Sequence, residues 1–318
     1  MKILQIVFIC LVTYTSCKGD TIPDLIIPFS ANWDVGDKIK YKVTKTKEDI
    51  KFGYSHGKYE TTQVGVLEIM DKTDNAYELE WKIIETIYPE GIEMDTFYTR
   101  IYEEMMKAFS IRYTTDIEGQ FKDLINWEDI LNFQFEIMDN IAEIIEEEEG
   151  MNVEEIKMMF NQMFSSKEQV EAMFIQEIKL LHSFYGEIFQ SKKTTPKQKS
   201  IPNIFGGEDV LVNALIKIEK LDTAASIIVG YDSFELDENT KNEMLSNYIE
   251  SIEQKFGKGN VDTESVENIK MEINDNTLFD LDYSKGVANV VSFTRNVVVK
   301  SENQDLKRIK EIIIERIE

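Results

Sequence analysis

The string Gly53-Tyr54-Ser55-His56-Gly57 holds the residues of this sequence whose types and spacing most readily suggest chemistry. It fits the pattern G-x-S-x-G, in which a serine on a sharp strand-to-helix turn attacks an ester or amide carbonyl. That reaction needs a histidine as base, an acid that orients the histidine, and backbone N–H groups that stabilise the oxyanion. Downstream of the string the sequence offers one histidine, His182, in a segment with helical spacing.

The flanking sequence favours a structural interpretation of the string, although it resembles the nucleophile elbow of α/β-hydrolases. Residues 39–52 and 59–70 both have strand character, so the two glycines fit a tight bend between antiparallel strands. Too few residues precede the string to build the parallel sheet that supports such an elbow. We therefore predict an exposed hairpin tip at residues 53–57 and no catalytic residue. A secreted hydrolase that uses Ser55 or an unidentified pair of carboxylates is the alternative.

The residue types give little support to a metal or cofactor site. Both cysteines, Cys10 and Cys17, lie in the first seventeen residues, which leaves the body without a thiolate ligand or a disulfide. The two histidines have no metal-binding spacing, and the acidic run at residues 146–149 lacks the alternating oxygen ligands of a calcium loop. No phosphate-binding glycine loop precedes a helix. We predict no metal and no cofactor.

The N-terminal segment has the layout of a secretory signal. Lys2 precedes an apolar stretch, residues 3–13, that is too short to anchor the chain across a bilayer. The ending Thr15-Ser16-Cys17 resembles the lipobox of bacterial lipoproteins. This resemblance implies a signal peptide at residues 1–16, a lipid on Cys17 that attaches the protein to the membrane of the cell envelope (outer membrane or periplasm), and a tether at residues 17–32. Cleavage after Gly19 and secretion without a lipid is the alternative.

Composition limits the class of partner. The chain has 318 residues, a net charge of −24 and 42% hydrophobic residues, so it can bury a large core. A surface this acidic repels nucleic acid and anionic membrane surfaces, and we predict no nucleic-acid partner.

The hydrophobic pattern divides the body, residues 33–318, into regions of different periodicity. Residues 33–125 alternate apolar and polar side chains, as antiparallel strands do, except for a short helix predicted at residues 95–108. Residues 126–190 have helical spacing. In this helical segment Asn126 is a candidate N-cap, and Ser166 begins a capping box with Gln169.

The rest of the body returns to strand character. Residues 191–207 are polar and contain proline, so we predict a linker there. Residues 208–318 contain strands rich in β-branched residues and one helix that begins at Asp237.

These elements predict an α+β fold, in which a strongly curved antiparallel sheet from the N- and C-terminal regions packs on the inserted helical segment. The element order and the signal resemble the open-barrel carriers and lipocalin-like lipoproteins of the Gram-negative envelope. We expect a non-catalytic envelope lipoprotein that binds an apolar ligand or a protein partner; a purely structural envelope protein is a further alternative. The candidate ligand-binding residues are apolar side chains in excess of what one face of each helix needs: Phe133, Phe135, Met158, Phe184 and Phe189.

Overall fold

The computed structural model describes most of the body. The described residues are 25–87, 100–101, 104, 110–149, 152–154, 157–158, 166–191, 193–201, 210–246, 270–301 and 304–317. Cys17 and the predicted signal peptide lie outside these residues, and of the helix predicted at residues 95–108 only residues 100, 101 and 104 lie within them, all three helical.

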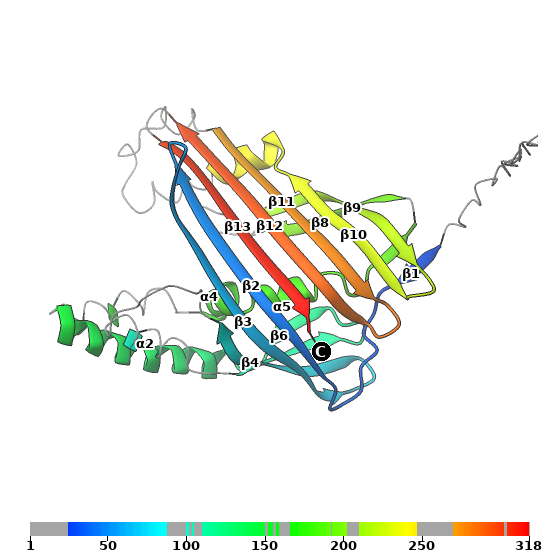
Figure 1. Cartoon of the computed structure of the whole chain (residues 1–318), viewed down its shortest axis with the longest axis horizontal. Helices are drawn as coiled ribbons and strands as arrows, with labels where there is room; N and C mark the ends of the chain where they lie inside the picture. Colours follow the sequence, from blue (N-terminus) through cyan, green and yellow to red (C-terminus); the bar gives the residue numbers. More distant parts are fainter. Residues whose placement is uncertain are drawn as a thin grey trace, which may run out of the picture.

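One large antiparallel sheet dominates the fold. Its eleven strands follow the order β6-β5-β4-β3-β2-β13-β12-β11-β10-β9-β8. Figure 1 shows the long strands side by side, with the red β13 between the blue β2 and the orange β12. The strands are β2 (Lys38–Lys51), β3 (Tyr54–Lys72), β4 (Ala76–Ile87), β5 (Ser110–Asp116), β6 (Phe121–Leu124), β8 (Thr194–Ile201), β9 (Val210–Asp222), β10 (Ile227–Glu235), β11 (Lys270–Asp282), β12 (Val287–Ser301) and β13 (Gln304–Arg316).

The pairing of β2 with β13 joins the N-terminal and C-terminal regions into a single sheet, which confirms the α+β class and the predicted origin of the strands. The strong curvature of the sheet stays a prediction. Strand alternation arises because successive side chains point to opposite faces of a strand. In β11, for example, Met271, Ile273, Phe279 and Leu281 are buried while their neighbours Glu272 and Leu278 are exposed. We call the face that carries the buried residues the inner face.

Apart from residues 100, 101 and 104, the described helices lie in the segment between β6 and β7 (Ile188–Gln190) and after β10. They are α2 (Trp127–Glu149), α4 (Lys167–Phe174) and α5 (Gln176–Leu181), and residues 238–246 are also helical. The capping box predicted at Ser166 is present, and Asp237 accepts a 2.9 Å hydrogen bond from the Thr240 N–H at the start of the later helix. Among the described residues, none of these helices has the length and apolar character needed to cross a bilayer.

Asn126 occupies the predicted position before α2, where its carbonyl accepts a 3.1 Å hydrogen bond from the Ile130 N–H, but its side chain bonds to the sheet and not to the helix. Its side chain bridges to the neighbouring strand β5, accepting a hydrogen bond from the Arg112 N–H at 2.8 Å and donating one to the Ser110 carbonyl at 2.9 Å. Asn126 thereby fixes the start of α2 against the sheet.

Helical structure ends earlier than the predicted boundary at residue 190. The last helix, α5, stops at Leu181, and residues 182–186 form turns that end at Gly186, whose φ of 76° favours glycine. The chain then forms β7 (Ile188–Gln190), which pairs with β1 (Ile26–Pro28) in a separate two-stranded sheet. Phe184 and Phe189 therefore lie on a turn and a strand.

Two segments predicted as connections belong to the folded body. Within the predicted tether, β1 pairs with β7, and the next residue, Phe29, is fully buried. Within the predicted linker, β8 forms the edge of the large sheet. Pro196 and the alternating lysines of β8 gave the segment the composition of a linker, but both are tolerated on an edge strand, where one row of backbone groups faces away from the sheet.

The buried side chains of the body form two separate clusters. The first core contains the largest buried rings and joins β1, β7 and α5 to the middle of the sheet; its members include Phe29, Trp33, Tyr41, Tyr77, Tyr113, Ile178, Leu181, Tyr185, Phe279 and Ile312. The second core lies at the other end of the C-terminal strands, under the helix at residues 238–246. Its members are Ile201, Val210, Val212, Ala214, Phe234, Met244, Leu245, Met271, Ile273 and Val297, with Leu236 and Val299 packed against them.

Candidate functional site

Ser55 lies at the start of a strand that continues a hairpin. The turn is formed by Phe52 and Gly53, whose φ angles are 49° and 80°, and Ser55 then pairs with Ile50 across the hairpin. Ser55 and its neighbour His56 are both exposed, and as successive strand residues they point to opposite faces. The predicted hairpin is confirmed, but its tip lies at Phe52 and Gly53, and residues 54–57 belong to β3 instead of the turn. The strand-to-helix turn that a nucleophile elbow needs does not occur at Ser55.

The remaining histidine, His182, is 2% exposed in the first core and is held by two hydrogen bonds. Its Nδ1 lies 2.7 Å from the Gly119 carbonyl oxygen, and its Nε2 lies 2.8 Å from the Tyr113 hydroxyl. A carbonyl oxygen only accepts, so Nδ1 carries the proton and Nε2 accepts from Tyr113. Burial lowers the pKa of His182 to about 4. His182 is therefore a neutral, fully bonded core residue at pH 7.

The five apolar candidate residues do not share one surface. Phe184 and Phe189 are 2% exposed and pack on Phe279 of β11, with ring centroids 4.2 and 5.4 Å from that ring. Phe133 and Phe135 are half-buried on α2, and Met158 is 59% exposed. Phe184 and Phe189 thus fill the first core and do not line an open groove.

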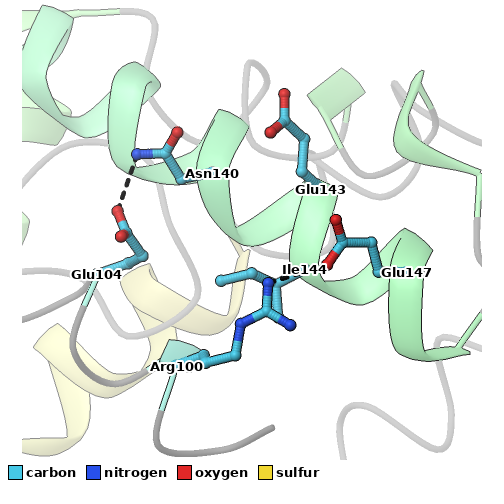
Figure 2. A pocket seen from close by; sticks show the side chains of 6 residues that line it. All are labelled: Arg100, Glu104, Asn140, Glu143, Ile144 and Glu147. Atoms are coloured by element: carbon cyan, nitrogen blue, oxygen red, sulfur yellow. Dashed lines mark hydrogen bonds and ion pairs between the residues drawn. The ribbon is translucent and has the colours of Figure 1, made fainter.

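A pocket beside α2 is polar and acidic. Figure 2 shows its lining residues, in which Arg100 pairs with Glu147 at 2.9 Å and Asn140 donates a 2.8 Å hydrogen bond to Glu104. The pocket has a volume of about 370 Å³. In the described part of the chain, no group of three or more His, Cys, Asp or Glu side chains is arranged to hold a metal ion. Four of the six lining side chains pair with one another in this way, as residues on a solvated surface do.

A second hollow, of about 570 Å³, lies where β2 and β12 begin and β13 ends. It is lined by Asn32, Trp33, Asp37, Lys38, Ile39, Ser284, Lys285, Val287, Arg316 and Ile317. Lys38 and Lys285 pair with carboxylates outside this lining, Glu68 at 3.0 Å and Asp282 at 3.9 Å. The hollow is a polar surface depression next to the first core.

A line of charged residues crosses the inner face between the two cores. In β10, β11 and β12 a charged residue separates the members of one core from those of the other: Asp232, Asp275 and Arg295. Lys310 of β13 and Lys47 of β2 extend this line across the sheet. We call these five residues the charged belt.

Three members of the belt form a row of cations on adjacent strands. In the sheet register, Lys310 lies directly opposite Arg295 on one side and directly opposite Lys47 on the other. We call Arg295, Lys310 and Lys47 the cationic row. Like charges in directly opposed positions of an antiparallel sheet destabilise it, so this row costs the fold free energy.

Only part of the positive charge has a counter-charge among the described residues. Arg295 makes a bidentate ion pair with Asp275, with both N–O distances 2.7 Å. Lys45, which lies two positions before Lys47, pairs with Glu177 of α5 at 2.6 Å. Lys310 donates to the neutral Gln176 side chain. Burial, followed by Lys45 and Arg295, lowers the pKa of Lys310, and the Glu177 carboxylate opposes this shift in part.

The acidic members of the belt are buried. Asp275 is 3% exposed, and its two oxygens are engaged by Arg295. Asp232 accepts a 2.6 Å hydrogen bond from Lys199 through Oδ2, while its buried Oδ1 has no hydrogen-bond partner in the described part of the chain.

The sequence contained a signal for this row in the parity of its residues. Lys45 and Lys47 share odd numbering with the buried Ile39, Tyr41 and Val43 of β2. Lys310 likewise shares even numbering with the buried Ile312 and Ile314 of β13. Because the side-chain period of a strand is two, these lysines belong to the inner face.

No family model matches the chain, and no curated protein matches it. Among solved structures, an outer membrane channel from Pseudomonas putida F1 is similar at 7% sequence identity and a TM-score of 0.18, over 91% of this chain and 98% of that chain. A TM-score this low carries no argument about fold or function.

Proposed function

We propose that the chain is a non-catalytic, lipid-anchored protein of the cell envelope that binds a ligand with an apolar part on the inner face of its sheet. The proposal rests on one observation, the charged belt that interrupts the inner face between two apolar cores. The anchor is the lipid expected on Cys17. Phe184 and Phe189 are buried and do not line the apolar groove expected from the sequence, so we place the ligand on the inner face of the sheet instead.

A sheet with a purely structural role has little use for such a belt. Charged groups on a partly buried face lose hydration, and they are tolerated there only when they are paired and hydrogen-bonded. A continuous apolar face would stabilise the fold more, since replacing buried ion pairs with packed apolar residues is often neutral or stabilising. The belt therefore supports a binding role more than a structural one.

The side chains that hydrolysis would need are placed unfavourably for it. Ser55 is exposed on a hairpin, and His182 is buried and hydrogen-bonded on both ring nitrogens. A base must come within hydrogen-bond reach of the proton it abstracts. These positions favour binding over a serine hydrolase.

Binding is tested on the full mature chain with N-phenyl-1-naphthylamine, a neutral apolar dye whose emission rises in apolar sites. We expect saturable binding of the dye, and native mass spectrometry of protein purified without delipidation should show a small-molecule adduct on the monomer. A bare monomer that also fails to bind the dye would contradict the proposal and favour the structural alternative.

A further inference from the structure

We propose that the cationic row binds the anionic group of a single-chain amphiphile, a carboxylate or a phosphate monoester carried on an apolar chain. This inference rests on the proposed binding function and names the class of its ligand. The row supplies the charge, and the edge of the second core supplies the apolar contact.

The spacing of the row suits one anion. Neighbouring strands lie about 5 Å apart, and Arg295, Lys310 and Lys47 occupy directly opposed positions on β12, β13 and β2. Their side chains leave the same face of the sheet, so the two ammonium groups and the guanidinium can converge on one carboxylate or phosphate. Hydrogen bonds between charged partners of this kind are about twice as strong as neutral ones.

The charge balance leaves room for an added anion. Asp275 is engaged by Arg295, and Glu177 is engaged by Lys45. Within the described part of the chain, Lys47 and Lys310 form no ion pair: Asp49 and Glu177 interact with them electrostatically at longer range, and Lys310 donates its hydrogen bond to the amide of Gln176. An anion at this place would remove repulsion that the unliganded protein bears.

The row is accessible from solvent. Lys47 is exposed and Lys310 is half-buried. The net charge of −24 repels an anionic bilayer as a whole, so the local positive charge fits one amphiphile molecule better than a membrane surface.

Apolar side chains border the row on the inner face. Toward the second core, Val297 and Val299 of β12 follow Arg295, and Leu306 of β13 pairs with Val299. On β13 and β2 the ion pair of Arg308 and Asp49 lies next to the row, so the apolar border is on the β12 side. Val299 and Leu306 are half-buried, so an alkyl chain that extends from the row toward the second core would cover them. This order of charge and apolar surface matches the order of groups in an amphiphile.

The unliganded protein provides the first test, through Lys47→Gln and Lys310→Gln. If the positive charges of the row are not neutralised in the unliganded protein, each change removes repulsion between neighbouring cations. We then expect the Tm to rise by about 1–3 °C. Lys307→Gln is the matched control, because Lys307 lies on the same strand as Lys310 but on the opposite face. A fall in Tm for both Lys47→Gln and Lys310→Gln would show that the chain itself neutralises the row, and would overturn the inference.

Binding of three ligands that share a sixteen-carbon chain provides the second test on the full mature chain. We expect palmitate or hexadecyl phosphate to displace N-phenyl-1-naphthylamine with a Kd on the order of tenfold lower than that of hexadecanol. The better of the two anions identifies the headgroup as a carboxylate or a phosphate. Lys47→Gln and Lys310→Gln should remove this advantage, and Lys307→Gln should keep it.

The outcomes separate this inference from the proposed function. If hexadecanol binds as tightly as both anions, the protein binds apolar ligands but the cationic row does not recognise a headgroup. If none of the three ligands binds and the dye does not bind either, the proposed function and the inference both fail.

Discussion

The Tyr113 hydroxyl donates a 2.8 Å hydrogen bond to Nε2 of His182 inside the first core. The Gly119 carbonyl accepts the proton on Nδ1 at 2.7 Å, so the ring meets both of its hydrogen-bonding needs without a charge. A protonated ring would donate from both nitrogens. The Tyr113 hydroxyl would then have to rotate its hydrogen away so that its oxygen could accept from Nε2–H. The pair thus ties the stability of the core to the protonation of one imidazole.

Acidification should destabilise the protein before its carboxylates titrate. The pKa of His182 falls from an ordinary value of 6.5 to about 4 on folding. Between these values the unfolded chain binds more protons than the folded protein, so stability rises with pH and is lost as pH falls from about 6.5 to 4. We expect a loss of roughly 3 kcal/mol over this interval, measured by urea unfolding at several pH values.

The control separates this histidine from the exposed one. His56→Gln should keep the slope of stability against pH, whereas His182→Gln should flatten it, whatever its stability at pH 7. NMR titration of the wild-type protein supplies an independent measurement. An imidazole signal of His182 that titrates near pH 6.5 in the folded protein would contradict the prediction.

The two bidentate Arg–Asp pairs of the inner face should differ strongly in their contribution to stability. The side chains of Arg295 and Asp275 are 14% and 2% exposed, while those of Arg308 and Asp49 are 46% and 25% exposed. Asp275→Asn leaves a buried guanidinium without its counter-charge and should cost about 3–5 kcal/mol. Asp49→Asn should cost about 1 kcal/mol or less. Equal costs in chemical denaturation would show that burial does not control these pairs.

Gly65 should tolerate no side chain while Trp81 keeps its position. A Cβ placed on Gly65 would lie 2.2 Å from Cζ2 of Trp81, so the indole must move. We expect Gly65→Ala to cost about 1–3 kcal/mol, measured by chemical denaturation together with tryptophan fluorescence. In a Trp81→Leu background the cost of Gly65→Ala should fall, and an unchanged cost would locate the strain elsewhere.

Ser55→Ala should leave both the Tm and any esterase activity of the protein unchanged, because Ser55 is exposed beside a hairpin turn. Labelling with a serine-reactive phosphonate provides the measurement on the wild-type protein. Specific modification of Ser55 would contradict this prediction and support the hydrolase alternative.

The mature protein should begin at a lipid-modified Cys17. Intact mass spectrometry of protein extracted from membranes should show the mass of the added acyl chains on an N-terminal fragment, and Cys17→Ser should abolish it. An unmodified N-terminus at Asp20 would support cleavage after Gly19 and secretion instead.

Local patterns in the sequence predicted most of the strands and helix starts. Alternation of burial in β4 and β11 follows the polar and apolar alternation of their residues, and the capping box at Ser166 forms as predicted. These features depend on residues close together in the chain, so the sequence displays them directly.

Features that depend on partners distant in sequence could not be predicted in the same way. Residues 26–28 form a strand by pairing with residues 188–190, and Pro196 is compatible with β8 because β8 is an edge strand. Likewise, Lys310 joins Arg295 and Lys47 through the register of three strands. Polar composition alone could not distinguish a tether or a linker from these strands.

The position of β13 has a consequence for how the protein is made. Arg308 of β13 reaches Asp49 of β2 across 259 residues of chain, and among the described strands β13 is the one that hydrogen-bonds to both halves of the sheet, through β2 and β12. Until β13 emerges, the strands that precede it remain as two ribbons, each with a long unpaired edge at β2 or β12. Pairing over such distances is slow. The joining of the two ribbons by β13 is therefore expected to be a late step of folding, which no part of the chain before residue 304 can complete.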